Sequence, residues 1–95
     1  MHVISRKALV EAAKKHSDAE ASLDAWHKVA DRATWQNLAE LRKTYPSADY
    51  VAPFVVFNIK GNDYRLIVKI EFRWQMIFIK HVLTHAEYDK GDWKK

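Results

Sequence analysis

The stretch from Tyr64 to Arg73 alternates cleanly between apolar and polar residues, and this alternation constrains the fold more than any other feature of the chain. Its apolar positions are Tyr64, Leu66, Val68, Ile70 and Phe72. Its polar positions are Arg65, Lys69, Glu71 and Arg73, with Ile67 between them. Successive side chains of a strand point to opposite faces, so this pattern predicts a strand over 64–72 with one buried and one polar face. Such a strand needs a second layer of structure against its apolar face.

Two further strands are predicted beside it. Residues 54–59 are dense in β-forming residues, and residues 76–83 form a similar run after a turn at 73–75. The turn at 60–63 joins the first two strands, with Gly61 and Asn62 able to take positive φ. Val3 and Ile4 are expected to form a very short additional strand.

The first half of the chain has helical periodicity instead. Helices are expected over about residues 6–15, 18–33 and 37–43, where apolar residues recur at helical spacing. Ser5 is expected to cap the first helix, and Ser17 with Glu20 forms a capping-box pattern for the second. Thr84 with Glu87 forms the same pattern for a short turn of helix after the last strand. Helices followed by strands indicate an α+β domain spanning 1–95, with the helices on one face of a small antiparallel sheet. The other sheet face is then expected to be partly open and basic.

Composition narrows the class of protein. The chain has no cysteine, which excludes disulfides and thiolate metal sites and fits a reducing cytosol. The first residues lack the apolar core of a signal peptide, and no stretch reaches the length of a membrane span, so a cytoplasmic protein is expected. The net charge of +4 is concentrated in residues 51–95, which hold eight basic and five acidic residues. This modest positive field suits RNA or an acidic protein partner.

The polar sheet face gathers groups that could act on RNA. Arg65 lies on the central strand, while His85 and Tyr88 follow the last strand. Cleaving RNA without a metal requires a base for the ribose 2′-hydroxyl, a cation for the charge on the phosphate and an acid for the leaving oxygen. The planar guanidinium of Arg65 suits phosphate, and His85 suits proton transfer. Tyr88 could share that role if a neighbouring cation lowered its pKa.

Each of these residues also has a structural interpretation. Arg65 alone is more often a solvated charge, His85 a turn cap and Tyr88 an aromatic at the edge of the core. Asn58 and Asn62 are more often turn formers than ligands. His81 and His85 are four residues apart, but His81 falls in a strand, so they do not share a helical face as metal ligands would. No metal or cofactor is expected.

Several stretches resemble the HigB toxins of the RelE-like superfamily. Residues 57–66 are similar to their central hairpin, residues 84–89 to their C-terminal signature, and residues 1–5 and 45–49 are also similar. The resemblance implies a RelE-like α+β fold and a metal-independent endoribonuclease that cuts mRNA, usually on the ribosome. It also implies neutralisation by a cognate helix-turn-helix antitoxin, HigA-like, with DNA bound only through the toxin–antitoxin complex and no membrane partner.

Matched by position, the resemblance assigns catalysis to Arg65, His85 and Tyr88. His85 stands where the superfamily has a basic residue, which leaves the identity of the general base open. The residues expected to bind substrate, from the resemblance and from the basic face, are Asn58, Lys60, Lys69, Arg73 and Lys80. Two alternatives remain: a non-catalytic module that binds RNA or ribosomes through the same face, and an inactive toxin-like scaffold retained for antitoxin binding.

Overall fold

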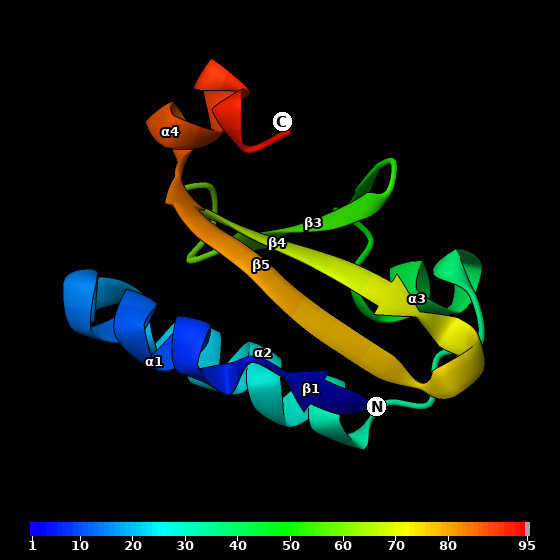
Figure 1. The fold of residues 1–95 in the computed structure, drawn as a ribbon. Coiled ribbons are helices and arrows are strands. Elements are labelled where there is room, and N and C mark those ends of the chain that lie inside the picture. Colours follow the sequence, from blue (N-terminus) through cyan, green and yellow to red (C-terminus); the bar gives the residue numbers. More distant parts are fainter. Residues whose placement is uncertain (95) are drawn as a thin grey trace.

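The computed structural model describes residues 1–94 of the 95-residue chain. In chain order its elements are β1 (His2–Ile4), α1 (Arg6–Lys15), the 3₁₀ turn η1 (Ser17–Ala19), α2 (Glu20–Arg32), α3 (Leu38–Thr44), β2 (Asp49–Val51), β3 (Phe54–Ile59), β4 (Tyr64–Glu71), η2 (Phe72–Trp74), β5 (Met76–Thr84), α4 (His85–Lys90) and η3 (Asp92–Lys94). Figure 1 shows α1 and α2 on one side of the sheet, and α4 with the C-terminal turn beyond the other. The expected α+β class is confirmed.

The sheet is larger than the sequence predicts and is mixed. Its strand order is β1-β5-β4-β3-β2, with β3, β4 and β5 forming the expected antiparallel centre. At one edge β1 runs parallel to β5, and at the other β2 pairs antiparallel with β3. The strand β2 was not predicted, because it has three residues and two of them are exposed.

The helices cover the apolar face of β4, as the alternation predicts. Leu66 and Val68 are completely buried there, in the same core as Leu23 and Trp26 of α2. The ring of Trp26 packs edge-on against Phe57 of β3, with ring centroids 5.4 Å apart. Edge-on aromatic packing of this kind adds to the stability already gained from burying the rings.

Two of the three predicted helix starts are wrong in detail. Ser5 has a left-handed backbone, with φ of 70°, and its side chain caps nothing. Ser17 opens the short turn η1, and α2 starts three residues later without a side-chain cap. The predicted capping box at Thr84 is present, since the Glu87 amide donates to Thr84 Oγ1 at 3.2 Å and the Thr84 amide donates to Glu87 Oε1 at 2.9 Å. Asn37 Oδ1 caps α3 by accepting from the Glu40 amide.

The second face of the sheet, expected to be partly open and basic, also carries a small apolar cluster. Trp93 in η3 is only 6% exposed and forms a small apolar cluster with Val56 and Ile67. The segment after Gly91 is therefore anchored to the sheet through Trp93. Beside this cluster β5 has a bulge: Ile67 pairs with His81 and Val68 with Ile79. Lys80 is the extra residue between them, and it is exposed.

Candidate active site

Arg65 lies on the second face of β4, where it is buried and is not the solvated charge of the structural alternative. Its residue exposure is 8%, the lowest of any charged residue among those described. Its Nη1 donates to the backbone oxygens of Asn62 at 3.0 Å and Tyr64 at 3.2 Å. Its Nη2 donates to Asn62 Oδ1 at 2.9 Å. A buried cation needs such acceptors, and here they fix the guanidinium in one orientation.

Tyr88 of α4 covers this guanidinium. The Arg65 Cζ lies 5.5 Å from the centroid of the Tyr88 ring, a cation–π distance. Trp93 stacks on the same tyrosine with ring centroids 5.1 Å apart and an interplanar angle of 16°, and its Nε1 donates to the Tyr88 carbonyl at 3.0 Å. Because Arg65 and Trp93 both lie against the ring, its hydroxyl edge is the part left for a substrate.

The protonation state of Tyr88 differs from the expectation. Burial raises the pKa of Tyr88 above its ordinary value of 10.0, and the negative charges of Asp49 and Asp89 raise it further. Arg65 lowers this pKa, but its effect is smaller than those of burial and Asp49. Tyr88 was expected to share the role of His85 only if a neighbouring cation lowered its pKa; because the net effect of its surroundings is to raise the pKa, this condition is not met, and the hydroxyl carries its proton at neutral pH.

His85 is the first residue of α4 and is half exposed. Its backbone amide donates to the Asp63 carbonyl at 3.0 Å, which ties the start of α4 to the β3–β4 turn. Its Nε2 lies 3.2 Å from Asp89 Oδ2, one helical turn further along. The turn that holds Arg65 through Asn62 thus also holds His85 through Asp63. Arg65, His85 and Tyr88 are brought to one end of the sheet.

The five residues expected to bind substrate are more dispersed. Asn58 is exposed and directly opposite Arg65 in the β3–β4 register. Lys69 lies four residues along β4, about 13 Å from Arg65 at the usual rise of a strand, and is 3.9 Å from Glu71. Lys80 lies in the β5 bulge. Arg73 lies beyond the far end of β4, where it packs over the Trp74 ring.

Lys60 is held on the helix side of the hairpin. Its Nζ donates to Asp18 Oδ2 at 2.9 Å, while the Tyr64 hydroxyl donates to Asp18 Oδ1 at 2.6 Å. The bond from the Tyr64 hydroxyl and, to a smaller extent, the bond from Lys60 lower the pKa of Asp18. The bond to Asp18 in turn raises the pKa of Tyr64 to about 12. The ammonium of Lys60 therefore already has an anionic partner, and it anchors the turn to η1.

Comparisons with known proteins identify the family of this chain. The family model for HigB toxins, described as the RelE-like toxic component of a toxin–antitoxin system, matches residues 19–91. The chain belongs to the HigB toxin family. The mRNA interferase toxin HigB of Escherichia coli K12 is 34% identical over 92 residues, covering 94% of this chain and 88% of the relative. The mRNA interferase HigB of Escherichia coli O6:H1 strain CFT073 is 32% identical over 93 residues, covering 95% and 90%.

The HigB family match includes Arg65, His85 and Tyr88, yet the geometry adds residues that the sequence interpretation missed. Asn62 was considered only as a turn former that could take a positive φ. In the turn, positive φ values occur instead at Lys60 (53°) and Gly61 (64°). The oxygens of Asn62 hold Arg65. Asp89 and Trp93 were also missed. The sequence signal that could have indicated Asp89 is its position four residues after His85, because side chains at this spacing on a helix are neighbours.

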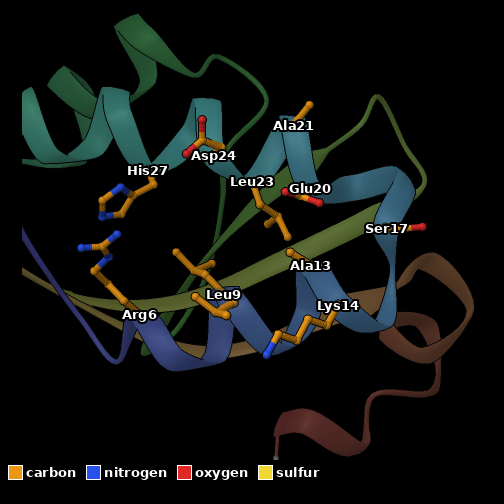
Figure 2. A pocket seen from close by; sticks show the side chains of 11 residues that line it. Arg6, Leu9, Ala13, Lys14, Ser17, Glu20, Ala21, Leu23, Asp24 and His27 are labelled. Carbon is orange, nitrogen blue, oxygen red and sulfur yellow. The ribbon is translucent and has the colours of Figure 1, made fainter.

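A hollow on the surface of this HigB-family chain lies away from the candidate site. A groove of about 600 Å³ runs between α1 and α2, and Figure 2 shows Arg6 and His27 pointing toward each other across it. Leu9, Ala13 and Leu23 contribute apolar surface to its lining. None of the candidate site residues lines it. Within residues 1–94, no cluster of three His, Asp or Glu side chains has an arrangement suited to a metal ion, and no helix is long and apolar enough to cross a membrane.

Proposed function

We propose that this HigB-family toxin is a metal-independent endoribonuclease that cuts mRNA on the ribosome. The observation that carries the proposal is the fixed Arg65 guanidinium against the ring of Tyr88, whose hydroxyl is neutral, with His85 on the same short helix α4. The Escherichia coli relatives are named mRNA interferases, which supports the same activity.

The proposed reaction is an internal transfer at one phosphodiester. The ribose 2′-oxygen forms a bond to phosphorus as its proton leaves, and the bond from phosphorus to the 5′-oxygen breaks as that oxygen gains a proton. The products are a 2′,3′-cyclic phosphate and a 5′-hydroxyl. Arg65 stabilises the negative charge that grows on the non-bridging oxygens, because its donors are already oriented before the reaction.

His85 and Tyr88 divide the proton transfers in this proposal. His85 takes the proton of the 2′-hydroxyl, with Asp89 orienting the ring through Nε2. Tyr88 supplies the proton to the leaving 5′-oxygen, since its hydroxyl is neutral and its ring faces lie against protein groups. Asn58 and Lys80 bind the RNA strand beside Arg65, and Lys69 and Arg73 extend the contact along the sheet.

The partners follow from the family and from the charge. A toxin of a toxin–antitoxin system has an antitoxin. We assign this role to a helix-turn-helix protein of the HigA type, so that DNA is bound only through the complex, in the cytoplasm. The net charge of +4 gives modest RNA affinity, so the ribosome holds the message in place for the toxin.

The decisive experiment is expression of Arg65→Ala in cells, with the exposed Arg32→Ala as the matched control. We expect Arg65→Ala to abolish growth arrest and new mRNA ends, while Arg32→Ala behaves like the parent. The ends left by the parent should carry a 2′,3′-cyclic or 3′-phosphate. An Arg65→Ala toxin that still cuts mRNA would disprove the assignment of Arg65, and ribosome binding without any cut ends would favour a non-catalytic module.

A further inference from the structure

Asn62 is an exposed turn residue whose two oxygens both serve Arg65. Its backbone oxygen accepts from Nη1 at 3.0 Å and its Oδ1 accepts from Nη2 at 2.9 Å. Together these bonds occupy the end of the guanidinium that lies between Nη1 and Nη2. The Tyr64 carbonyl also accepts from Nη1, at 3.2 Å.

The remaining donors of Arg65 lie on a single edge. A guanidinium has five N–H groups in fixed positions, and three of them are used here. The two that remain are Nε–H and the second Nη2–H, which point in parallel from the side of the group. Nε makes no hydrogen bond within residues 1–94, so in this part of the chain the edge has no protein partner.

We propose that Asn62 is a positioning residue, which turns the Nε–Nη2 edge of Arg65 toward the two non-bridging oxygens of the phosphate to be cut. This proposal rests on the proposed function, and it identifies the residue that orients Arg65 for phosphodiester cleavage. Two parallel N–H donors match two phosphate oxygens bidentately, whereas a free guanidinium could present either of its edges. Asn62 removes that choice by occupying the competing edge.

The turn that carries Asn62 is itself immobilised on both sides. The Asp63 amide donates to the Lys60 carbonyl at 3.2 Å, and the Asp63 carbonyl accepts from the His85 amide at 3.0 Å. On the helix side, Lys60 is bound to Asp18. Asn62 therefore stands on a fixed support that also positions the start of α4. A positioning contact needs such support, because small displacements of a catalytic group reduce rates strongly.

The test is a double-mutant cycle on purified toxin with mRNA-programmed ribosomes, measured as a single-turnover cleavage rate at saturating toxin. Asn62→Ala should slow cleavage about 10- to 100-fold in the wild-type background. In an Arg65→Lys background it should slow cleavage less than about threefold, because lysine has no edge to orient. Asn37→Ala, which removes the cap of α3 on the helix side, controls for a general loss of stability and should leave the rate unchanged.

Each outcome decides between positioning and simple structural support. Equal rate losses in the two backgrounds, or a rate loss for Asn37→Ala matching that for Asn62→Ala, would mean that Asn62 only stabilises the fold. An unchanged rate for Asn62→Ala would overturn this inference alone, because wild-type cutting would still support the proposed function. Wild-type toxin that leaves no cut ends would overturn both.

Discussion

At the scale of single residues, the hydroxyl of Tyr88 is the group whose chemistry the fold changes most. Burial and the neighbouring carboxylates raise its pKa, and Arg65 only partly offsets them. A phenol that stays protonated can donate a proton to a leaving oxygen but is a poor base near neutral pH. The role of general base then falls to His85, whose ring is paired with Asp89.

Tyr88→Phe should therefore slow cleavage about 100-fold while leaving the fold intact. Phenylalanine keeps the ring against Trp93 and over Arg65, so only the proton donor is lost, and such donors typically contribute 10²- to 10⁴-fold. The measurement is the cleavage rate on programmed ribosomes beside the thermal unfolding midpoint. Tyr50→Phe, at an exposed tyrosine of β2, is the control. A Tyr88→Phe toxin that cuts within threefold of the parent would exclude the hydroxyl from the reaction.

At the scale of elements, α4 carries two of the three proposed catalytic residues although it is only six residues long. A helix of this length is marginal alone, so its capping box matters more than it would in a longer helix. Glu87 closes that box, and its bond from the Thr84 amide is the main reason why the pKa of Glu87 is lowered from 4.5. The thermodynamic consequence is a contribution to stability that depends on pH.

Glu87→Gln should make the stability of the protein less sensitive to acid. A carboxyl group with a lower pKa in the folded state binds fewer protons there than in the unfolded state, so its contribution is present above pH 4.5 and is lost as the pH falls through the folded value. Glutamine can still close a capping box, which keeps the neutral-pH stability close to that of the parent. Urea denaturation at a series of pH values below 6 measures this. Parallel pH profiles for the two proteins would show that Glu87 contributes nothing to acid sensitivity.

The elements also explain which parts of the structure could be predicted from the sequence. The capping box at Thr84 and the strand alternation after Tyr64 depend on residues a few positions apart, and both are present as predicted. The pattern at Ser17 is equally local, yet no cap forms there. Its neighbour Asp18 is instead bound to Tyr64 and Lys60, more than forty positions along the chain. Contacts over such separations leave no periodic signal in the sequence.

The candidate site was predictable to a similar extent. The family resemblance and the strand alternation both indicated Arg65 as a site residue. Neither predicted its burial, because that burial depends on the C-terminal segment folding back over the sheet. Asn62 was a plausible turn residue by composition, and only the observed hydrogen bonds show that it serves Arg65. The local sequence therefore predicts which groups are present, and the tertiary contacts determine how they are presented.

At the scale of the whole molecule, the sheet separates two apolar clusters of unequal size. The larger one lies between the sheet and the helices, and the smaller one joins Val56, Ile67 and Trp93 on the face that carries Arg65. Figure 1 shows the C-terminal segment lying beyond the sheet on the side opposite α1 and α2. The tail thus has two functions: it completes the fold on this face and supports the ring of Tyr88.

Trp93→Ala should test both functions together. Truncating a buried tryptophan typically costs about 3–5 kcal/mol of unfolding free energy, a large share of the stability of a small domain. Trp74→Ala is the matched control, because Trp74 is 66% exposed and packs mainly against Arg73, so about 1 kcal/mol or less is expected. Urea denaturation measures the difference between the two variants.

The same pair of variants separates support of the site from stability of the fold. Under conditions where Trp93→Ala remains folded, we expect its cleavage rate to fall about tenfold or more, because Tyr88 loses the ring that stacks on it and the donor to its carbonyl. Trp74→Ala should cut at the parental rate. If Trp93→Ala were as stable as Trp74→Ala, the small cluster would contribute little to the fold. If folded Trp93→Ala cut at the parental rate, Tyr88 would be positioned by α4 and Arg65 alone.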